Sequence, residues 1–394
     1  MDSLEQFART KLDAIGERGL MRHILPTHRG AGGTALRDGR RLTSFCCNDY
    51  LNLTQHPDVI EAACEAARTY GAGAGASRLI TGSSPLMDEL EARLARLKGT
   101  EAACVFGSGY MANIGIIPCL ASPEDVVFID ELAHACLFAG VRMSRAVTHV
   151  FRHNDMDHLE ALLRAERPRH PHALILTDGV FSMDGDLAPL DIMGPLARAH
   201  DAWLMTDDAH GVGVVGRDGR GSAFAFGAGK ADVPLQMGTL SKAIGSYGGY
   251  LCASAPVIDF IRNRARSLIF TTGLPPASVG ASLAALDIIE NDPALRAAPL
   301  DRARLFAERL DLPEPVTPIV PLIVGKAEAA MAASATLLEQ GFLVSAIRPP
   351  TVPEGTARLR ITFMATHNER DVIALAVAIR ALEAEIGFPL RTTA

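Results

Sequence analysis

The chain has 394 residues, too many for one core of ordinary size, because domains commonly hold about 100 to 200 residues. Apolar residues make up 48% of the sequence and charged residues 21%, which excludes an intrinsically disordered chain. The net charge of −7 argues against a nucleic-acid partner bound through a basic face.

The cysteines and the uncharged stretches narrow the class of protein further. Seven cysteines occur without a C-x-x-C pair, which gives neither a zinc knuckle nor a redox motif and favours free thiols in a reducing compartment. The first residues contain no apolar signal core. Two long stretches, 102–123 and 267–286, lack charge, but glycines and Pro118 interrupt the first and the Pro275-Pro276 pair the second. We therefore expect a soluble cytoplasmic protein with no membrane span and no metal site.

Residues 1–47 are predicted to form an N-terminal arm. Apolar residues recur at helical spacing in its first part, at Leu4, Phe7, Leu12 and Ile15. A glycine-rich turn follows at 30–33. Such an arm is suited to wrapping a partner chain, and a helix packed on the surface of its own chain is the alternative.

Between about residues 100 and 255, short apolar runs alternate with longer amphipathic stretches. The runs are bounded by turn residues and predict buried strands at 102–106, 126–129, 174–177, 203–206 and 235–237. The stretches between them predict covering helices, for example at 132–145 and 189–200. This alternation is typical of an α/β fold with a mostly parallel sheet covered by helices on both faces. It defines a large domain over residues 48–290.

The pattern changes towards the C-terminus. Helical segments around 256–310 are followed by three predicted strands and a closing helix, at 319–324, 342–346, 357–363 and 368–386. Asn291-Asp292-Pro293 interrupts the helical pattern and sets a boundary near residue 290. Residues 291–394 are therefore predicted to form a smaller α+β domain.

One glycine motif has the spacing of a dinucleotide-binding site. The stretch Gly211–Gly216 matches G-x-G-x-x-G and follows a predicted strand, but its third glycine should open a helix. Turn residues follow at 217–221 instead. A nicotinamide or flavin site is therefore not expected.

A stronger signal lies at the carboxyl end of the strand predicted at 203–206, where open α/β sheets bind their ligands. Asp207-Asp208-Ala209-His210 follows that strand, and Lys242 comes 32 residues after His210 in a turn of small and hydroxyl residues. Taken singly, the lysine is typical of a solvated turn and the aspartates of a helix cap. In this order and spacing they suit pyridoxal 5′-phosphate, because the lysine can form the Schiff base while the carboxylate holds the ring nitrogen protonated.

Two further features suit the same cofactor. Gly107-Ser108-Gly109-Tyr110 leads from a predicted strand into a helix, where backbone N–H groups can meet a phosphate. A plain strand-to-helix turn is the alternative. His134 follows the strand predicted at 126–129 and is placed to lie flat on an aromatic cofactor, although a purely structural histidine also fits there.

An ordered set of motifs extends these features over residues 45–365. The motifs are Asn48-Asp49-Tyr50-Leu51, Gly73–Arg78, Gly107–Tyr110, Leu132–Ala135, Asp178–Asp186, Asp207–Gly211, Ser241-Lys242 and Thr271–Pro276. They closely resemble those of the α-oxoamine synthases, a pyridoxal-phosphate family with the aminotransferase-like fold of type I. That resemblance implies the two domains described above and a homodimer whose sites are built from both chains.

Within the family, the C-terminal motifs are the most specific. The string Ala346–Pro353, followed by Arg358-Leu359-Arg360, most resembles the branch that condenses L-alanine with a pimeloyl thioester in biotin biosynthesis.

The resemblance implies a role for each matched residue around the cofactor. Lys242 is the Schiff-base lysine, Asp207 pairs with the pyridine nitrogen and His210 with the ring oxygen. His134 stacks on the ring and Ser182 lies beside it. The phosphate or its surroundings are served by Ser108, Gly109, Tyr110 and Thr239. The implied catalytic residues are Lys242, His134, Asp207 and His210.

On the substrate side, Arg360 matches the arginine that clamps the amino-acid carboxylate, a bidentate task suited to a guanidinium group. The other matches are Arg22, Asn48, Ser77 and Thr351. Ser77 stands where the glycine-using relatives tend to carry threonine, which leaves room for the methyl group of alanine. Cys136 and Met87 replace a serine and a histidine that are common in the family, and we expect both to lie beside the site.

The implied reaction is a decarboxylative condensation of L-alanine with pimeloyl-CoA or a pimeloyl carrier protein. Lys242 then has to take a proton from Cα, so its pKa must lie well below the reference value of about 10.4. Burial next to a cationic ring is expected to lower it.

Three other readings of the sequence stay open. One is a sibling enzyme, such as glycine C-acetyltransferase or a synthase with another acyl chain length. A second is a pyridoxal-dependent aminotransferase or lyase, which needs no thioester. A third is a protein that kept the fold without catalysis.

Overall fold

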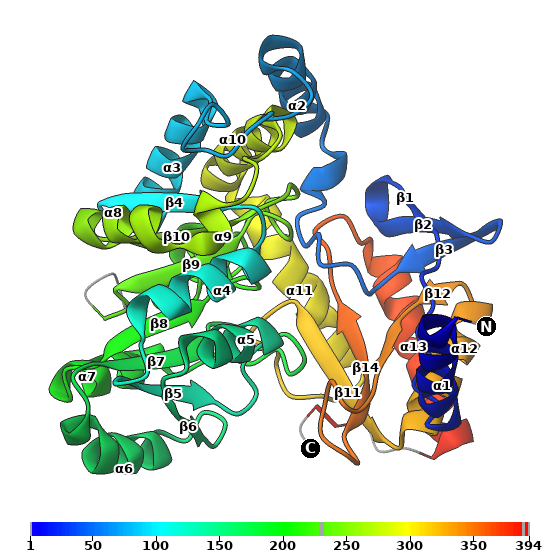
Figure 1. Ribbon diagram of the computed structural model, residues 1–394. Helices are drawn as coiled ribbons and strands as arrows, with labels where there is room; N and C mark the ends of the chain where they lie inside the picture. Colours follow the sequence, from blue (N-terminus) through cyan, green and yellow to red (C-terminus); the bar gives the residue numbers. More distant parts are fainter. Residues whose placement is uncertain (1, 228–231, 388–390, 393–394) are drawn as a thin grey trace.

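A seven-stranded sheet forms the centre of the larger part of the chain (Figure 1). The computed structural model describes residues 2–227, 232–387 and 391–392. From one edge to the other, the strands are β4 (Ala102–Phe106), β10 (Gly249–Ala253), β9 (Leu235–Thr239), β8 (Trp203–Asp207), β7 (Ala173–Asp178), β5 (Val126–Asp130) and β6 (Val147–Phe151). Strand β10 runs antiparallel to both of its neighbours, and the remaining pairs are parallel. The prediction of a mostly parallel sheet is confirmed.

The five predicted strands are present, and two more were not predicted. Every residue of β5 and β7 is buried, which explains their continuous apolar runs. Strand β6 lies at the edge of the sheet and exposes most of its side chains, so its sequence lacks such a run. Strand β10 is short, begins with glycine and contains small residues, which weakens its strand signal.

Helices cover both faces of this sheet, as predicted (Figure 1). One face packs against α4 (Gly109–Leu120), α5 (Ala135–Ser144), α8 (Ala255–Arg264) and α9 (Arg266–Ile269). The other face packs against α3 (Pro85–Lys98), α6 (Met156–Glu166), α7 (Leu190–Ala199) and α10 (Pro276–Asn291), and α2 (Pro57–Tyr70) packs on α10. The helices predicted at 132–145 and 189–200 are confirmed as α5 and α7.

A smaller α+β part follows, as predicted. Its elements are α11 (Pro293–Arg309), β11 (Ile319–Gly325), α12 (Ala327–Glu339), β12 (Phe342–Leu343), β13 (Ser345–Ile347), β14 (Ala357–Thr362) and α13 (Glu369–Ile386). Strands β11, β14 and β13 form an antiparallel sheet over a core that includes Phe306, Leu359 and Val372. At the predicted boundary, Asp292 caps α11 by accepting the N–H of Leu295 at 2.8 Å.

One predicted strand of this part is wrong. The residues expected to form a single strand at 342–346 are divided between β12 and β13, which belong to different sheets. The backbone N–H of Phe45 bonds to the carbonyl of Leu343, so β12 pairs with the N-terminal segment while β13 pairs with β14. Apolar periodicity is the same on both sides of Val344 and does not reveal such a switch.

The N-terminal segment divides into two parts. Helix α1 (Ser3–Glu17) buries none of its residues, which fits the projecting arm that was expected. Strands β1 (His28–Arg29), β2 (Thr34–Arg37) and β3 (Arg40–Ser44) instead form a sheet with β12, and Phe45 enters the core of the smaller part. The second half of the predicted arm of residues 1–47 therefore packs within the chain, and the limits of the arm stay a prediction.

The predicted domain limits at residues 48–290 and 291–394 stay predictions. Residue 1 of the arm and residues 388–390 and 393–394 of the C-terminal domain lie outside the described residues. Within the described ranges, no helix combines the length and apolar character needed to cross a membrane.

Candidate active site

A cavity of about 190 Å³ opens at the carboxyl ends of β5, β7 and β8, the edge where the sequence predicted a ligand. Its lining includes eight predicted site residues: Ser108, Gly109, Tyr110, His134, Asp207, His210, Thr239 and Lys242. The remaining lining residues are Cys136, Asp178, Ala209 and Ser241. The fold therefore brings together groups from five separate stretches of the sequence.

The N-terminus of α4 forms one end of the cavity. Ser108 caps the helix by accepting the N–H of Met111 on its hydroxyl at 3.2 Å, and the other N–H groups of the first turn have no partner within the helix. A Cβ at Gly109 would lie 3.2 Å from Cε of Met237 and 3.6 Å from Cβ of Thr239, so glycine keeps this approach open. Beside it, the Thr239 hydroxyl donates to the carbonyl of Gly248 at 2.7 Å and lies 2.8 Å from the Ser241 hydroxyl, so the free donors at this end are the N–H groups of the helix and the Ser108 hydroxyl. Such a set of donors suits a phosphate group.

Asp207, the last residue of β8, and Asp208, which follows it, have different environments. Asp208 forms an ion pair with the buried Lys98 at 2.8 Å and accepts the N–H of Ser222 at 3.0 Å. Asp207 faces the cavity and accepts the N–H of Ala209 on Oδ1 at 3.0 Å. Asp208 is therefore a structural residue, and Asp207 is the carboxylate available to a bound ring.

Asn113 holds the other oxygen of Asp207, and our sequence analysis did not single it out. Its Nδ2 donates to Oδ2 of Asp207 at 2.7 Å and lies 3.0 Å from Sγ of Cys136. Asn113 is fully buried on α4, one turn after the N-terminus of that helix. Only its place three residues after the motif Gly107–Tyr110 could have indicated it, since the contact with Asp207 spans 94 residues.

His134 is held in one tautomer. Its Nδ1 accepts the backbone N–H of Cys136 at 3.3 Å and lies 2.7 Å from Sγ of Cys136, which leaves the proton on Nε2. Burial lowers the pKa of the imidazole, against the pull of Asp207, and the charge of Lys242 lowers it further. The backbone N–H of His134 donates to Oδ1 of Asp178 at 3.0 Å. His134 is therefore a neutral side chain with a donor at Nε2.

Two acidic groups beside Asp207 have raised pKa values. Burial and the charge of Asp207 raise the pKa of Asp178 well above its usual value. The same two causes raise the pKa of the Cys136 thiol to about 12. Cys136 thus lies beside the site, as expected, whereas Met87 packs in the hydrophobic core on α3 and does not line the cavity. The expectation that Met87 lies beside the site stays a prediction.

Lys242 lines the cavity from the turn after β9. Burial lowers its pKa, and the charge of Arg360 lowers it further, although Asp207 and Asp178 act in the opposite direction. The direction of the expected shift, a lowering of the Lys242 pKa, is confirmed. It increases the share of neutral amine near pH 7, and neutral amine is the form that can act as a nucleophile or a base.

His210 forms a buried pair with Tyr50, a second residue absent from the predicted set. The Tyr50 hydroxyl and Nδ1 of His210 lie 2.7 Å apart. Burial raises the pKa of Tyr50 to about 12, and burial together with Lys242 lowers the pKa of His210 well below its usual value. Tyr50 is therefore the donor, and His210 keeps its proton on Nε2.

Arg360 lies on β14 of the smaller part, close enough for its charge to act on both Lys242 and His210. Its Nη1 donates to Oδ1 of Asn48 at 3.1 Å, and its Nε donates to the carbonyl of Ser182. The third nitrogen, Nη2, is buried and has no partner among the described residues. A buried guanidinium with one unsatisfied end fits a carboxylate ligand.

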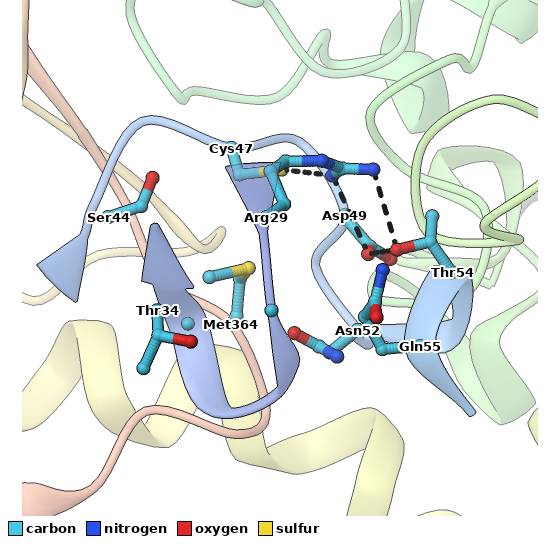
Figure 2. Close-up of a pocket in the computed structure, with 11 residues that line it drawn as sticks. Arg29, Thr34, Ser44, Cys47, Asp49, Asn52, Thr54, Gln55 and Met364 are labelled. Atoms are coloured by element: carbon cyan, nitrogen blue, oxygen red, sulfur yellow. Dashed lines mark hydrogen bonds and ion pairs between the residues drawn. The ribbon is translucent and has the colours of Figure 1, made fainter. Parts of the chain in front are cut away.

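Asn48 and Tyr50 hold side chains of the site in place. Asn48 contacts Arg360, Tyr50 contacts His210, and Asp49 between them belongs to a second, small pocket (Figure 2). In Figure 2, Arg29 and Thr54 converge on the Asp49 carboxylate, with the Thr54 hydroxyl at 2.5 Å and Nη1 of Arg29 at 3.8 Å. Burial raises the pKa of Asp49 despite these contacts. The contacts of Asp49 in this pocket hold the segment that carries Asn48 and Tyr50.

Six predicted residues do not line the cavity of the described chain: Asn48 and Arg360, whose contacts are described above, and Ser182, Ser77, Arg22 and Thr351. Ser182 contacts the site through its backbone carbonyl, which accepts a hydrogen bond from Arg360. Ser77 forms an isolated bridge with Thr272, and Arg22 and Thr351 are exposed. Their predicted roles towards substrate stay predictions.

The donor set fits pyridoxal 5′-phosphate. A helix N-terminus with hydroxyl groups suits its phosphate, Asp207 with two hydrogen-bond donors suits the ring nitrogen, and Lys242 is an amine of lowered pKa. Close to the glycine motif at 211–216, the chain forms turns and a short 3₁₀ helix at Arg217–Gly219.

Comparison with known proteins supports this reading. The family model for class I and II aminotransferases matches residues 40–379. An 8-amino-7-oxononanoate synthase of Methylocella silvestris is 65% identical over 345 residues, which cover 88% of this chain and 98% of the relative. The enzyme of the same name from Maricaulis maris is 60% identical over 380 residues, which cover 96% of each chain.

Solved structures of related enzymes share the fold. A variant of serine palmitoyltransferase from S. paucimobilis, with a bound PLP–myriocin aldimine, superposes with a TM-score of 0.91 at 29% identity, covering 98% of this chain and 100% of that chain. The 8-amino-7-oxononanoate synthase of Francisella tularensis superposes with a TM-score of 0.76 at 27% identity, covering 88% and 98%. The chain therefore belongs to the class I and II aminotransferase family and, within it, to the 8-amino-7-oxononanoate synthases, acyltransferases of the α-oxoamine synthase type whose cofactor is pyridoxal 5′-phosphate.

Proposed function

We propose that the enzyme condenses L-alanine with pimeloyl-CoA, or with pimeloyl carrier protein, to give 8-amino-7-oxononanoate, CO₂ and the free thiol carrier in biotin biosynthesis. The observation behind this proposal is the buried Nη2 of Arg360, which has no partner among the described residues and lies within electrostatic reach of Lys242. An α-amino acid needs such a pair, because its carboxylate and its amino group must be held at the same time. The name of the relatives supports the choice of acyl substrate.

We assign the cofactor to the groups that line the cavity. When bound, pyridoxal 5′-phosphate supplies an electron sink for the negative charge that forms at Cα of the amino acid. Its phosphate is assigned to the N-terminus of α4, and its covalent attachment to Lys242. The ring contacts are assigned to Asp207 at the nitrogen, His210 at the ring oxygen, His134 at the ring face and Ser182 beside the ring. Asn113 and Tyr50 hold the first two of these groups in place.

The proton transfer from Cα falls to Lys242. Its lowered pKa favours the neutral amine, so Nζ can accept the proton near pH 7. Arg360 orients the carboxylate of alanine, and the same carboxylate leaves as CO₂ after the new carbon–carbon bond has formed. His134 can donate a hydrogen bond from Nε2 to the thioester carbonyl oxygen, which gains negative charge when the carbonyl carbon is attacked.

The direct test is a product assay read by mass spectrometry. Purified holoenzyme is incubated with L-alanine and pimeloyl-CoA, and the proposal requires 8-amino-7-oxononanoate together with free CoA. A panel of acyl thioesters with alanine, glycine and serine tests the sibling reactions, including that of glycine C-acetyltransferase. Faster turnover of another acyl or amino-acid substrate would overturn the proposed substrate pair, and transamination without CoA release would overturn the condensation itself.

We further propose that two copies of the chain form the working enzyme. Large apolar side chains are exposed near the bridge between Ser77 and Thr272, among them Ile80 at 75% and Phe270 at 70% exposure. Ser77 does not line the cavity of its own chain, so we assign it to the cavity of the second copy. Light scattering should give twice the chain mass of 41.9 kDa, and a mass near 41.9 kDa would contradict the dimer.

The compartment is also a proposal. All seven cysteines lie in the described part of the chain and have free thiols. Free thiols are typical of a reducing compartment, which favours the cytoplasm.

A further inference from the structure

His153 lies just after β6 and joins two carboxylates outside the cavity. Its Nδ1 is 3.1 Å from Oδ1 of Asp130, and its Nε2 is 2.8 Å from Oδ2 of Asp186. The ring packs edge-on against Phe181 with a centroid distance of 4.4 Å. An ionised carboxylate only accepts hydrogen bonds, so a histidine between two carboxylates must donate from both nitrogens, as an imidazolium ion does.

The two carboxylates belong to segments that contribute residues to the site. Asp130 ends β5 and precedes His134 by four residues. Asp186 follows Ser182 by four residues in the loop 179–188. The bridge through His153 therefore connects the segment that presents His134 with the loop that presents Ser182.

The loop 179–188 is closed by its own backbone. The N–H of Phe181 donates to the carbonyl of Asp186 at 3.0 Å, and the N–H of Gly185 donates to the carbonyl of Phe181 at 2.8 Å. Val180 and Leu187 form an isolated bridge at its base. A shift of Asp186 must therefore move the whole loop, including the carbonyl of Ser182.

The smaller part of the molecule contacts the other side of this loop. Nε of Arg360 donates to the carbonyl of Ser182, and Nη1 of Arg358 donates to Oδ1 of Asp184 at 2.5 Å. The Thr317 hydroxyl donates to the carbonyl of Gly185 at 2.6 Å. The orientation of the Arg360 guanidinium thus depends on where the loop is held.

We propose that His153 is a positioning residue for amino-acid binding: by bridging Asp130 and Asp186, it fixes the Ser182 carbonyl that directs Arg360 towards the substrate carboxylate. This inference rests on the proposed function, which assigns the carboxylate to Arg360. His153 itself touches neither cofactor nor substrate. Its loss should therefore weaken binding of the amino acid more than it slows the chemical steps.

The protonation of His153 gives the bridge a pH dependence. Three acidic groups face it: Asp130 on β5, Asp186 on the loop, and Glu131, whose Oε1 accepts the backbone N–H of His153 at 2.8 Å. Burial acts to lower the pKa of His153, but the hydrogen bonds and charges of Asp130 and Asp186 outweigh it and raise the pKa to about 10. The stabilisation is fully present below the unfolded value of about 6.5 and is lost as the pH rises through about 10.

The test compares His153→Gln with His149→Gln, a control on β6 whose imidazole stacks on Phe128 and lies 3.9 Å from Glu166. For His153→Gln, the KM for L-alanine should rise about tenfold while kcat stays within about twofold of the wild type, because the loss falls on substrate orientation. In wild type and in His149→Gln, but not in His153→Gln, the KM should also rise as the pH approaches 10. His149→Gln should match wild type in both constants.

Hydrogen exchange supplies a readout that does not depend on turnover. Amides of residues 180–187 should exchange faster in His153→Gln than in wild type or His149→Gln, with or without cofactor. Should His153→Gln fail to fold, Asp186→Asn serves instead, since its side chain is 39% exposed and the change removes only the charge. Unchanged KM or unchanged exchange in the folded variant would overturn the positioning role. Absence of product in the wild type would instead overturn the proposed function, and the exchange comparison would still decide whether the bridge holds the loop.

Discussion

The two halves of the site differ in how far their hydrogen bonds are satisfied within the chain. In the cofactor half, Asp207 has two hydrogen-bond donors, His134 has one tautomer, and Tyr50 fixes His210, all within one chain. In the substrate half, Arg360 keeps a buried nitrogen without a partner among the described residues. The difference indicates that the chain holds the residues of the cofactor half in place by itself and leaves a donor of the substrate half for the amino acid that we propose.

The largest expected effect concerns the amine at the centre of the cofactor half. Lys242→Ala should lower kcat by at least about a thousandfold, because it removes both the covalent attachment and the base. Steady-state turnover of alanine and pimeloyl-CoA measures this loss. Lys326→Ala is the matched control, since Lys326 is exposed at the start of α12 and should leave turnover unchanged. Turnover by Lys242→Ala at the wild-type rate would refute the assignment.

The next effect falls on the substrate half. Arg360→Lys keeps the charge but loses the planar fork, so the KM for L-alanine should rise about 10- to 100-fold, with a smaller change in the KM for pimeloyl-CoA. Initial rates at varied concentrations of each substrate separate the two constants. An equal rise in both constants would show that Arg360 does not select the carboxylate.

A smaller effect is expected for Asn113, which donates a hydrogen bond to Asp207. Asn113→Ala removes the donor at Oδ2, and the uncompensated carboxylate should cost about tenfold in kcat and weaken cofactor binding. Titration of the apoenzyme with pyridoxal 5′-phosphate measures the second quantity. Asn263→Ala is a suitable control, because its amide bonds only to the carbonyl of Asp259 on the exposed face of α8. Cofactor affinity equal to that of the control would remove Asn113 from the site.

The smallest effect concerns Ser77. In Ser77→Thr, the ratio of alanine to glycine turnover should fall by about tenfold, because one methyl group in a pocket is worth about 1–3 kcal/mol. Competition between the two amino acids, read by product mass, gives this ratio directly. If the ratio does not change, Ser77 does not contact the methyl group of alanine.

Much of the fold could be predicted because its signals are local. The buried runs of β5 and β7 and the break at Asp292 are readable in short windows of sequence. The edge strand β6 and the switch between β12 and β13 were missed, since both depend on which neighbour each strand finds. The placement of residues 34–45 with the smaller part depends on the same kind of long-range pairing.

The residues of the site also divide into those that a local motif predicts and those that it does not. Lys242, Asp207 and His134 occupy motif positions, and the structure places them together as predicted. Asn113 and Tyr50 act through contacts across 94 and 160 residues, which no local pattern reveals.

The central claim is that the amine of Lys242 binds the cofactor opposite Asp207. The most direct measurement is reduction of the holoenzyme with borohydride, followed by digestion and peptide mass mapping. The account predicts a phosphopyridoxyl adduct on the peptide that contains Lys242. Absence of that adduct, or its appearance on the buried Lys98 beside Asp208, would contradict the account.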